Sequence, residues 1–427
     1  MQTMPQIGTL DEALDRIQSG DTIMTGLFGN EPVHFLSKLH TIAPRVQGVT
    51  LWSMTIMNPY PVVYDPALKG RIDILSTFYN GGCRKGQSSR RYSMVPTNLH
   101  CAAQTILEAR RPNVFVAAVS PAAPDGTASL SFDLEMTLEG LAAADTVIFE
   151  INPSIPPVCG ECRVPLSRAS FCYEAQTPLP LADEPPITDA DRAIAEQVAS
   201  LVHDGDCIQL GIGSVPNAVG EQLIGKHDLG IHTEMLTASM GRLIRAGAVT
   251  NARKNLHPGV TIATFAHGDA ELYALMADNP AIELRRASYV NDPAVIAAND
   301  HMVSINTALE LDLTGQVCSE SIGPLQYTGT GGATDFAYGA YHSKGGRGIV
   351  ALHATAKGGR VSKIKPFLTP GAIVSISRNL TDYVVTEYGI AKLRSASVRQ
   401  RVDRLIAVAH PDFRAELRKE AERMLLW

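Results

Sequence analysis

The feature that most constrains the fold of this chain is a repeat of half-chain length. In each copy a helical pattern ends at a glycine, and an aspartate and an apolar run follow it. The aligned pairs are Gly20 with Gly205, Asp21 with Asp206, Ile23 with Ile208, Gly26 with Gly211 and, after an offset of one residue, Pro32 with Pro216 and Leu39 with Leu223. Chance could place some of these residues, because Gly-Asp and proline are common at turns and helix starts. Their joint spacing favours a duplication, and therefore two similarly built halves.

Each copy begins with a helix that its apolar spacing predicts. The residues that share one helical face are Leu10, Leu14 and Ile17 in the first copy and Ile194, Val198 and Leu201 in the second. In the second copy, Thr188 and Asp191 resemble a capping box, with aspartate in the place of the usual glutamate or glutamine.

Strand and helix patterns alternate along the chain. The strand candidates are "NVFVAAVS", "DTVIFEIN", "CIQLGIG", "VTIATFA", "AIVSIS" and "DYVVTEYG". This alternation is typical of an α/β fold with largely parallel sheets. A chain of 427 residues is too long for one ordinary core, and the proline-rich "EAQTPLPLADEPPIT", residues 174–188, is typical of a linker. We therefore predict two similar α/β domains, residues 1–180 and 181–427.

Charge and composition exclude several functional classes. A net charge of −6 argues against a nucleic-acid partner, which would need a basic stripe. No apolar run reaches transmembrane length, and the start "MQTMPQIGTLDEALDRI" lacks the pattern of a secretion signal. We therefore expect a cytoplasmic protein with no membrane partner, in which the seven cysteines are reduced thiols.

A glycine-bearing turn in the second half is a candidate phosphate site. "QLGIGSVPNAV" predicts a strand, a turn at Gly211-Ile212-Gly213 and a helix opened by Pro216. A helix N-terminus offers free N–H groups and the positive end of the helix dipole to a phosphate. The dinucleotide-binding fingerprint is incomplete, because its third glycine is absent, and a plain tight turn remains the alternative.

A second glycine-rich loop, in "YTGTGGATDFAYGA", is a candidate oxyanion site. Gly329, Gly331 and Gly332 precede Asp335 closely. Glycines let the backbone approach a ligand and direct its N–H groups at an oxyanion. The alternative is a flexible surface loop, but the structured sequence on both sides favours a functional role.

Two basic segments could bind a phosphate or a carboxylate. "TAKGGRVSKIKPFL" contains Lys357, Arg360, Lys363 and Lys365, and "YNGGCRKGQSSRRYSMVP" contains Arg84, Lys85, Arg90, Arg91 and Tyr92. Arginine is suited to bidentate capture of a carboxylate. Each segment could equally be a solvated surface.

Metal and serine chemistry have no signature in this chain. "CGEC", from Cys159 to Cys162, is a lone CxxC without a second ligand pair, so we expect no metal site. Neither an HExxH motif nor a GxSxG elbow is present.

Glu234 is the remaining candidate for catalysis. It stands in "DLGIHTEMLTA", a largely apolar, strand-like run. A glutamate in such a place is most often part of a satisfied ion pair, but carboxylates also act as covalent nucleophiles toward activated acyl carbons. A nucleophilic glutamate, a phosphate site and an oxyanion loop in one half would suit acyl transfer from a phosphate-bearing thioester.

Taken together, these residues resemble the acetyl-CoA hydrolase/CoA-transferase family, which includes 4-hydroxybutyrate CoA-transferase. In the C-terminal half the resembling stretches are "DGDCIQLGIGSVPNAV", "DLGIHTEM", "YVNDP", "INTALELDLTGQV" and "TGTGGATDFAYGA". In the N-terminal half they are "GDTIMTG", "SPAAPDGTASLS" and "VIFEINPSIPPVCG". The resemblance covers nearly the whole chain in the order of the family, and the joint match is far more specific than any one motif.

The resemblance implies a fold and a set of roles. It implies two open α/β domains of the CoA-transferase type with the active site between them, and Glu234 as the nucleophile. The residues that it assigns to coenzyme A are Gly211, Ile212, Gly213, Ser214, Val215, Gly331, Gly332 and Lys357. Coenzyme A is then a substrate, no cofactor is tightly bound, and a homodimer or higher homo-oligomer is expected.

Two departures from the family bear on the substrate. The chain has "LTASMGRL" after its HTEM where a Ser-Asp-Gly type turn is common, and Ala333-Thr334 where Gln-Val is common. They resemble the branch of itaconate CoA-transferase, with succinyl-CoA as donor and a dicarboxylate acceptor; 4-hydroxybutyrate, butyrate or acetate are the other acceptors. The expected substrate-binding residues are Arg84, Arg90, Arg91 and Asn291. An acyl-CoA hydrolase that uses the same glutamate, and a sugar-phosphate-binding module on a similar scaffold, remain as alternatives.

Overall fold

The computed structural model describes residues 5–426, which form two compact units. The first unit comprises Met1–Ala182 and Ile262–Val290, and the second comprises Asp183–Thr261 and Asn291–Trp427. The predicted boundary after residue 180 lies in the coil between residues 174 and 189. Residues 262–290, which lie within the predicted second domain, belong instead to the first unit.

The first unit contains a large sheet with helices between its strands. Its elements are β1 (Gln6–Gly8), α1 (Leu10–Asp15), β2 (Thr22–Thr25), α2 (Val33–Lys38), β3 (Val49–Trp52), α3 (Pro61–Tyr64), β4 (Ile72–Ser76), α4 (Gly81–Gly86), β5 (Tyr92–Met94), α5 (Leu99–Arg110), β6 (Val114–Val119), β7 (Thr127–Ser129), α6 (Thr137–Ala143), β8 (Thr146–Ile151), β9 (Cys159–Gly160), β10 (Arg163–Pro165), β11 (Phe171–Glu174), β14 (Thr261–Ala266), α10 (Ala270–Met276), β15 (Ile282–Leu284) and α11 (Ala287–Val290).

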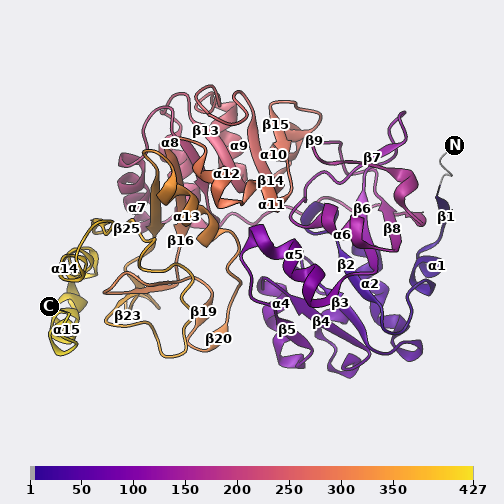
Figure 1. Cartoon of the computed structure of the whole chain (residues 1–427), viewed down its shortest axis with the longest axis horizontal. Coiled ribbons are helices and arrows are strands. Elements are labelled where there is room, and N and C mark those ends of the chain that lie inside the picture. Colours follow the sequence, from indigo (N-terminus) through magenta and orange to yellow (C-terminus); the bar gives the residue numbers. More distant parts are fainter. Residues whose placement is uncertain (1–4, 427) are drawn as a thin grey trace. The chain divides into compact units, whose positions relative to one another are not determined.

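The eight strands of this sheet run in the order β1-β11-β8-β6-β2-β3-β4-β5, and every pairing is parallel. Figure 1 labels β1, β8, β6, β2, β3, β4 and β5 of this sheet. The central strand β2 lies between β6 and β3. Its four residues are all buried, as expected of a parallel sheet covered by helices.

The second unit has the same kind of architecture. Its elements are α7 (Asp189–Ser200), β12 (Cys207–Leu210), α8 (Ser214–Leu223), β13 (Gly230–Leu236), α9 (Ala238–Arg245), α12 (Pro293–Ala297), β16 (Met302–Thr307), β17 (Glu310–Asp312), β18 (Val317–Cys318), β19 (Ser321–Ile322), β20 (Leu325–Gln326), α13 (Ala333–His342), β21 (Arg347–Ala351), β22 (Thr355–Ala356), β23 (Val361–Ser362), β24 (Ile364–Lys365), β25 (Tyr383–Thr386), β26 (Gly389–Lys392), α14 (Val398–Val408) and α15 (Pro411–Arg423).

Within this unit the main sheet has the order β26-β25-β21-β16-β12-β13. Its pairings are parallel except that between β25 and β26. The strand β12 lies between β16 and β13, just as β2 lies between β6 and β3. The predicted α/β fold with parallel sheets is therefore confirmed.

The sequence repeat forms the same turn in both units. Gly20 and Gly205 have φ angles of +84° and +83°, which glycine adopts without steric cost. The next residue accepts a backbone hydrogen bond with its carboxylate in both copies: Gln18 N donates to Asp21 at 2.7 Å, and His203 N donates to Asp206 at 2.6 Å. Each turn leads into the central strand of its sheet, so the two halves are built alike.

Two sequence-based expectations about local structure are wrong. "AIVSIS" forms no strand; Ile376 makes only an isolated bridge to Val317, and Ile373 and Val374 are exposed. The helix α8 begins at Ser214 rather than at Pro216. Proline fits the third position of a helix as well as the first, because the N–H groups of the first turn have no partner within the helix.

The helices give no sign of a membrane span. Within residues 5–426, every helix is too short or too polar to cross a lipid bilayer.

Candidate active site

Glu234 lies near the carboxyl end of β13, in the second unit. Its neighbours His232 and Thr233 are completely buried, whereas Glu234 is partly exposed. In α/β sheets, ligands bind outside the carboxyl ends of parallel strands. The strand therefore carries the carboxylate out of the core to the edge where a ligand can reach it.

The carboxylate of Glu234 has two hydrogen-bond donors from distant parts of the sequence. The side-chain amide of Asn291 donates to Oε2 at 2.9 Å, and the backbone N–H of Gly332 also donates to the carboxylate. Asn291 is fully buried and directly follows α11. Asn291 is a predicted substrate-binding residue, and in the structure its amide donates to the candidate nucleophile.

Gly332 approaches Glu234 so closely that no side chain fits between them. A methyl group at Gly332 would lie 1.8 Å from Glu234 Oε2 and 2.3 Å from Asn291 Nδ2. Gly331 precedes it with a φ of +54°, and α13 begins at the next residue, Ala333. This glycine loop therefore places its backbone directly against the carboxylate of Glu234; its predicted contact with a ligand oxyanion stays a prediction.

The local environment disfavours the ionised form of Glu234. Burial raises the pKa of this carboxyl to about 7; the Asn291 amide and the Gly332 N–H oppose the shift, and the charge of Asp335 adds to it. Perturbed pKa values of this kind gather at functional sites. In its ionised form, a glutamate carboxylate can act as a nucleophile toward an activated acyl carbon.

The predicted coenzyme A loop lies at the same edge of the sheet as Glu234. Strands β12 and β13 pair in parallel, with Cys207 opposite Gly230, so their carboxyl ends face the same side. The loop begins directly after β12, and Gly213, with a φ of +112°, precedes the first residue of α8. Ile212 is 57% exposed at its tip. A ligand phosphate at this loop would meet the N-terminal end of a ten-residue helix.

The residues that depart from the family pattern include two threonines, and both have hydrogen-bond partners. Ala333 and Thr334 are the first residues of α13, and the Thr334 hydroxyl donates to the carbonyl of Ser375. Thr237 precedes α9, and its hydroxyl lies 2.9 Å from that of Ser239. Both threonines therefore have local partners.

Lys357 directly follows β22, in the turn that connects this strand to its antiparallel partner β23. It is exposed and has a φ of +52°, and its carbonyl accepts a hydrogen bond from Arg360 Nε at 2.9 Å. The other two cations of this segment are less exposed: Lys365 pairs with Glu310 at 2.6 Å, and burial lowers the pKa of Lys363. Lys357 and Arg360 are thus its solvent-facing cations.

The N-terminal basic segment does not act as one patch. Arg91 is 3% exposed, and its guanidinium donates to the carbonyls of Ile72 and Val62 at 2.5 and 2.6 Å. The expectation that Arg91 binds substrate is therefore wrong, because its donors serve the backbone of its own unit. Arg90 is exposed, with a φ of +56°, and Arg84 lies on α4.

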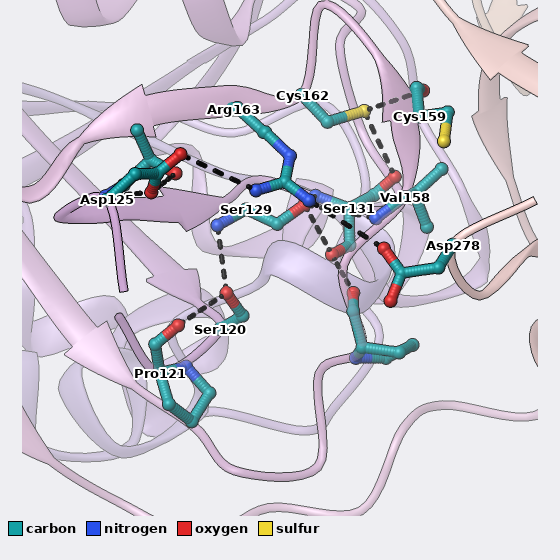
Figure 2. Close-up of polar contacts among 12 residues, drawn as sticks. Ser120, Pro121, Asp125, Ser129, Ser131, Val158, Cys159, Cys162, Arg163 and Asp278 are labelled. Atoms are coloured by element: carbon teal, nitrogen blue, oxygen red, sulfur yellow. Dashed lines mark hydrogen bonds and ion pairs between the residues drawn. The ribbon is translucent and has the colours of Figure 1, made fainter. Parts of the chain in front are cut away.

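The polar contacts around the CxxC segment stabilise the local fold (Figure 2). Cys162 is buried, its thiol donates to the carbonyls of Ser131 and Cys159 at 3.6 Å, and burial raises its pKa. Beside it, Arg163 lies 3.9 Å from Asp125 and 3.7 Å from Asp278. Among residues 5–426, no group of three or more His, Cys, Asp or Glu side chains is arranged to hold a metal ion.

A cavity of about 400 Å³ lies at the opposite edge of the second unit's sheet, where β21 and β25 begin. Its lining residues are Gly345, Gly346, Arg347, Asp382, Tyr383, Lys392, Arg394 and Ser395. None of the predicted site residues lines it. The candidate active site is therefore the open carboxyl edge around Glu234.

Comparison with known proteins finds relatives over nearly the whole chain. Residues 268–421 match the family model described as acetyl-CoA hydrolase/transferase C-terminal domain. The succinyl-CoA:cyclohexane-1-carboxylate CoA transferase of Geobacter metallireducens is 40% identical over 97% of this chain and 94% of its own length. The 4-hydroxybutyrate coenzyme A transferase of Clostridium kluyveri is 38% identical over 97% of each. RipA from Yersinia pestis, a solved structure, matches with a TM-score of 0.93 and 36% identity over 99% of this chain and 98% of that one.

The parallel α/β sheets and these relatives define an enzyme of the CoA-transferase type, with an acyl-CoA and a carboxylate as its substrates. The chain belongs to the acetyl-CoA hydrolase/CoA-transferase family, as its motifs indicated.

Proposed function

We propose that this enzyme transfers coenzyme A by a ping-pong mechanism in which Glu234 is the nucleophile. Glu234 attacks the thioester carbonyl, which forms a mixed anhydride with the acyl group and expels CoA thiolate. The thiolate then attacks the glutamyl carbonyl, which gives a glutamyl–CoA thioester and releases the first carboxylic acid. An acceptor carboxylate reverses both steps and leaves as the new acyl-CoA.

The position of Glu234 is the observation that carries this proposal. Its carboxylate is partly exposed at the carboxyl edge of the sheet and is held by Asn291 and Gly332. Backbone N–H groups at Gly331 and Gly332 would stabilise the oxyanion of each tetrahedral intermediate. A carboxylate fixed by two donors keeps one orientation for both attacks.

Coenzyme A is a substrate in this scheme, and no tightly bound cofactor is required. The loop Gly211–Val215 would receive its phosphates at the start of α8, and Lys357 would add a solvent-facing cation. A bound CoA would hold its thiolate close to the anhydride, so that the second attack is effectively intramolecular. Water must be kept from both intermediates, since hydrolysis would waste the activated acyl group.

For the substrates, we propose succinyl-CoA as donor and a dicarboxylate such as itaconate as acceptor. Succinyl-CoA is in the name of the Geobacter metallireducens relative. The exposed guanidinium of Arg90, with Arg84, is suited to a second carboxylate group. The other acceptors under this mechanism are 4-hydroxybutyrate, which is in the name of the Clostridium kluyveri relative, butyrate and acetate.

Intact mass spectrometry tests the mechanism directly. After addition of succinyl-CoA without acceptor, we expect a CoA adduct on the wild type, mapped to Glu234, and none on Glu234→Ala. An adduct with acetyl- or butyryl-CoA but not with succinyl-CoA would keep the mechanism and reject the proposed donor. Steady release of free CoA without acceptor would indicate a hydrolase. Absence of adduct and of turnover with every acyl-CoA would refute the nucleophilic role and leave the binding-module alternative.

Replacement of Arg90 tests the proposed acceptor. We expect Arg90→Ala to raise the KM for itaconate about tenfold and to leave the KM for acetate nearly unchanged, because only a dicarboxylate has a second anionic group to lose its partner. Arg91→Ala is the contrasting variant: it should lower Tm, since two backbone carbonyls lose their donors. Equal effects of Arg90→Ala on both acceptors would reject this arginine as a specificity determinant.

A further inference from the structure

The carboxylate of Asp191 connects three separate segments of the second unit. Its Oδ2 accepts the backbone N–H and the hydroxyl of Thr188, at 2.8 and 2.5 Å. Its Oδ1 accepts the hydroxyl of Ser214 at 2.8 Å and lies 3.0 Å from His353 Nε2. The side chain of Asp191 is 1% exposed, so this carboxylate is shielded from solvent by the surrounding protein.

The two acceptor oxygens of a carboxylate at this position make the arrangement possible. In a capping box the third helical residue reaches back to the N-cap, and glutamate or glutamine is usual there. The shorter aspartate closes the capping box of α7 with one oxygen and keeps the other for Ser214 and His353. A glutamine could not do both, because it has one acceptor oxygen and its amide nitrogen only donates.

The two partners of Oδ1 lie at the functional edge of the sheet. Ser214 is the first residue of α8 and belongs to the proposed coenzyme A loop, Gly211–Val215. His353 comes two residues after the end of β21. Although burial raises the pKa of Asp191, its hydrogen bonds from Thr188 and Ser214 and the neighbouring His353 hold the pKa below the usual value, so the carboxyl is charged at neutral pH.

We propose that Asp191 is a positioning residue that fixes the loop Gly211–Val215 for coenzyme A through Ser214 and His353. This inference rests on the proposed function of that loop. Two of its residues, Gly211 and Gly213, have no side chain to restrict the backbone. Ordering such a loop before the ligand arrives lowers the entropic cost of binding. Loss of Asp191 should therefore weaken acyl-CoA binding rather than slow the chemistry at Glu234.

A double-mutant cycle tests the inference. We expect Asp191→Asn to raise the KM for succinyl-CoA and the Kd of free CoA about tenfold, with kcat changed by less than about twofold. Ser214→Ala should have a similar effect. If Ser214 acts through Asp191, the double variant is no worse than the poorer single variant; if the two effects multiply, Ser214 contacts coenzyme A independently and the proposed link is refuted.

The control must separate loop positioning from helix stability. Gln400→Ala breaks the capping box of α14, which is in the same unit and outside the proposed site. It should lower Tm with an unchanged KM for succinyl-CoA. A wild-type KM in Asp191→Asn, or a fall in kcat alone, would overturn the inference. If Asp191→Asn does not fold, His353→Ala provides the same test, with the same expected rise in KM and the same refuting outcome.

Failure of the proposed function has a different signature. In that case wild type itself forms no CoA adduct at Glu234. If the function holds and only the inference fails, wild type and Asp191→Asn form the adduct at the same low succinyl-CoA concentrations. If both hold, Asp191→Asn forms the adduct only at raised concentrations.

Discussion

Replacing Glu234 with glutamine is expected to lower kcat by about 10⁴-fold or more and to abolish the CoA adduct. An amide has almost the same shape as the carboxylate and can still accept the hydrogen bond of Asn291, but it cannot attack a thioester. The KM for succinyl-CoA in any residual reaction should change little, because the proposed coenzyme A loop is untouched. Substantial turnover by this variant, after deamidation has been excluded by mass, would contradict the mechanism.

The raised pKa of Glu234 sets the pH dependence of both activity and stability. Only the ionised form attacks, so kcat/KM of the wild type should fall about tenfold per pH unit below about 7. The free energy of unfolding depends on pH in the opposite direction, falling as the pH rises. The folded pKa, about 7, exceeds the ordinary value of 4.5, so the folded state binds more protons between these two pH values. Rising pH therefore destabilises the wild type, by on the order of 3 kcal/mol once pH exceeds about 7.

Glutamine does not titrate, and this provides the control for the stability prediction. The Tm of Glu234→Gln should exceed that of the wild type at pH 8 and approach it at pH 4.5, where both side chains are neutral. A Tm difference between the two proteins that stays constant from pH 4.5 to 8 would show that ionisation of Glu234 does not destabilise the folded protein. The Tm difference should grow between pH 4.5 and about 7 and level off above about 7, the pH at which the activity profile has its midpoint, because both features report the folded-state pKa of Glu234.

The architecture followed from local patterns in the sequence. The helix face of Ile194 and Val198 and the apolar run of β12 reappear in the structure, because a parallel sheet between helices requires these periods. The predicted helix end at Gly205 is wrong: α7 ends at Ser200, and Gly205 lies in the turn that precedes β12. The half-chain repeat indicated two similarly built halves, and in the structure β2 and β12 occupy equivalent places in their sheets. The prediction of a strand at "AIVSIS" was wrong, because an apolar run forms a strand only where another strand is available to pair with it.

The candidate site could be predicted only in part, since its contacts join residues far apart in the chain. Motifs indicated Glu234 and the two glycine loops. Nothing local indicated that the Asn291 amide would meet a carboxylate 57 positions away. The burial of Arg91 could not be predicted from the sequence either. The residues around an arginine in a loop-like segment do not show whether its guanidinium faces solvent or, as here, donates to backbone carbonyls. Asp191 was recognised as a cap, but its contact with Ser214 depends on how α7 packs on α8.

Gly332→Ala should lower kcat by about 10²-fold or more without unfolding the protein. The added methyl group would lie 1.8 Å from Glu234 Oε2, far inside contact distance, and 2.3 Å from the Asn291 amide. One of these groups must therefore move, and a displacement of about 1 Å is enough to cost 10²-fold in rate. The rate of CoA adduct formation should fall with kcat, as measured by rapid-quench mass spectrometry.

A matched glycine substitution separates this collision from a general loss of backbone freedom. Gly225 lies just beyond α8 in the same unit, and a methyl group there would meet no atom within 4 Å. Gly225→Ala should keep wild-type kcat and adduct rate. Adding Gly332→Ala to Glu234→Gln should cause little further loss, because the methyl group acts on a carboxylate that is no longer there. A wild-type kcat in Gly332→Ala would mean that Glu234 reacts from a position other than the one it occupies in this structure. An independent loss of kcat in the double variant would mean that Gly332 serves the reaction through its own N–H group.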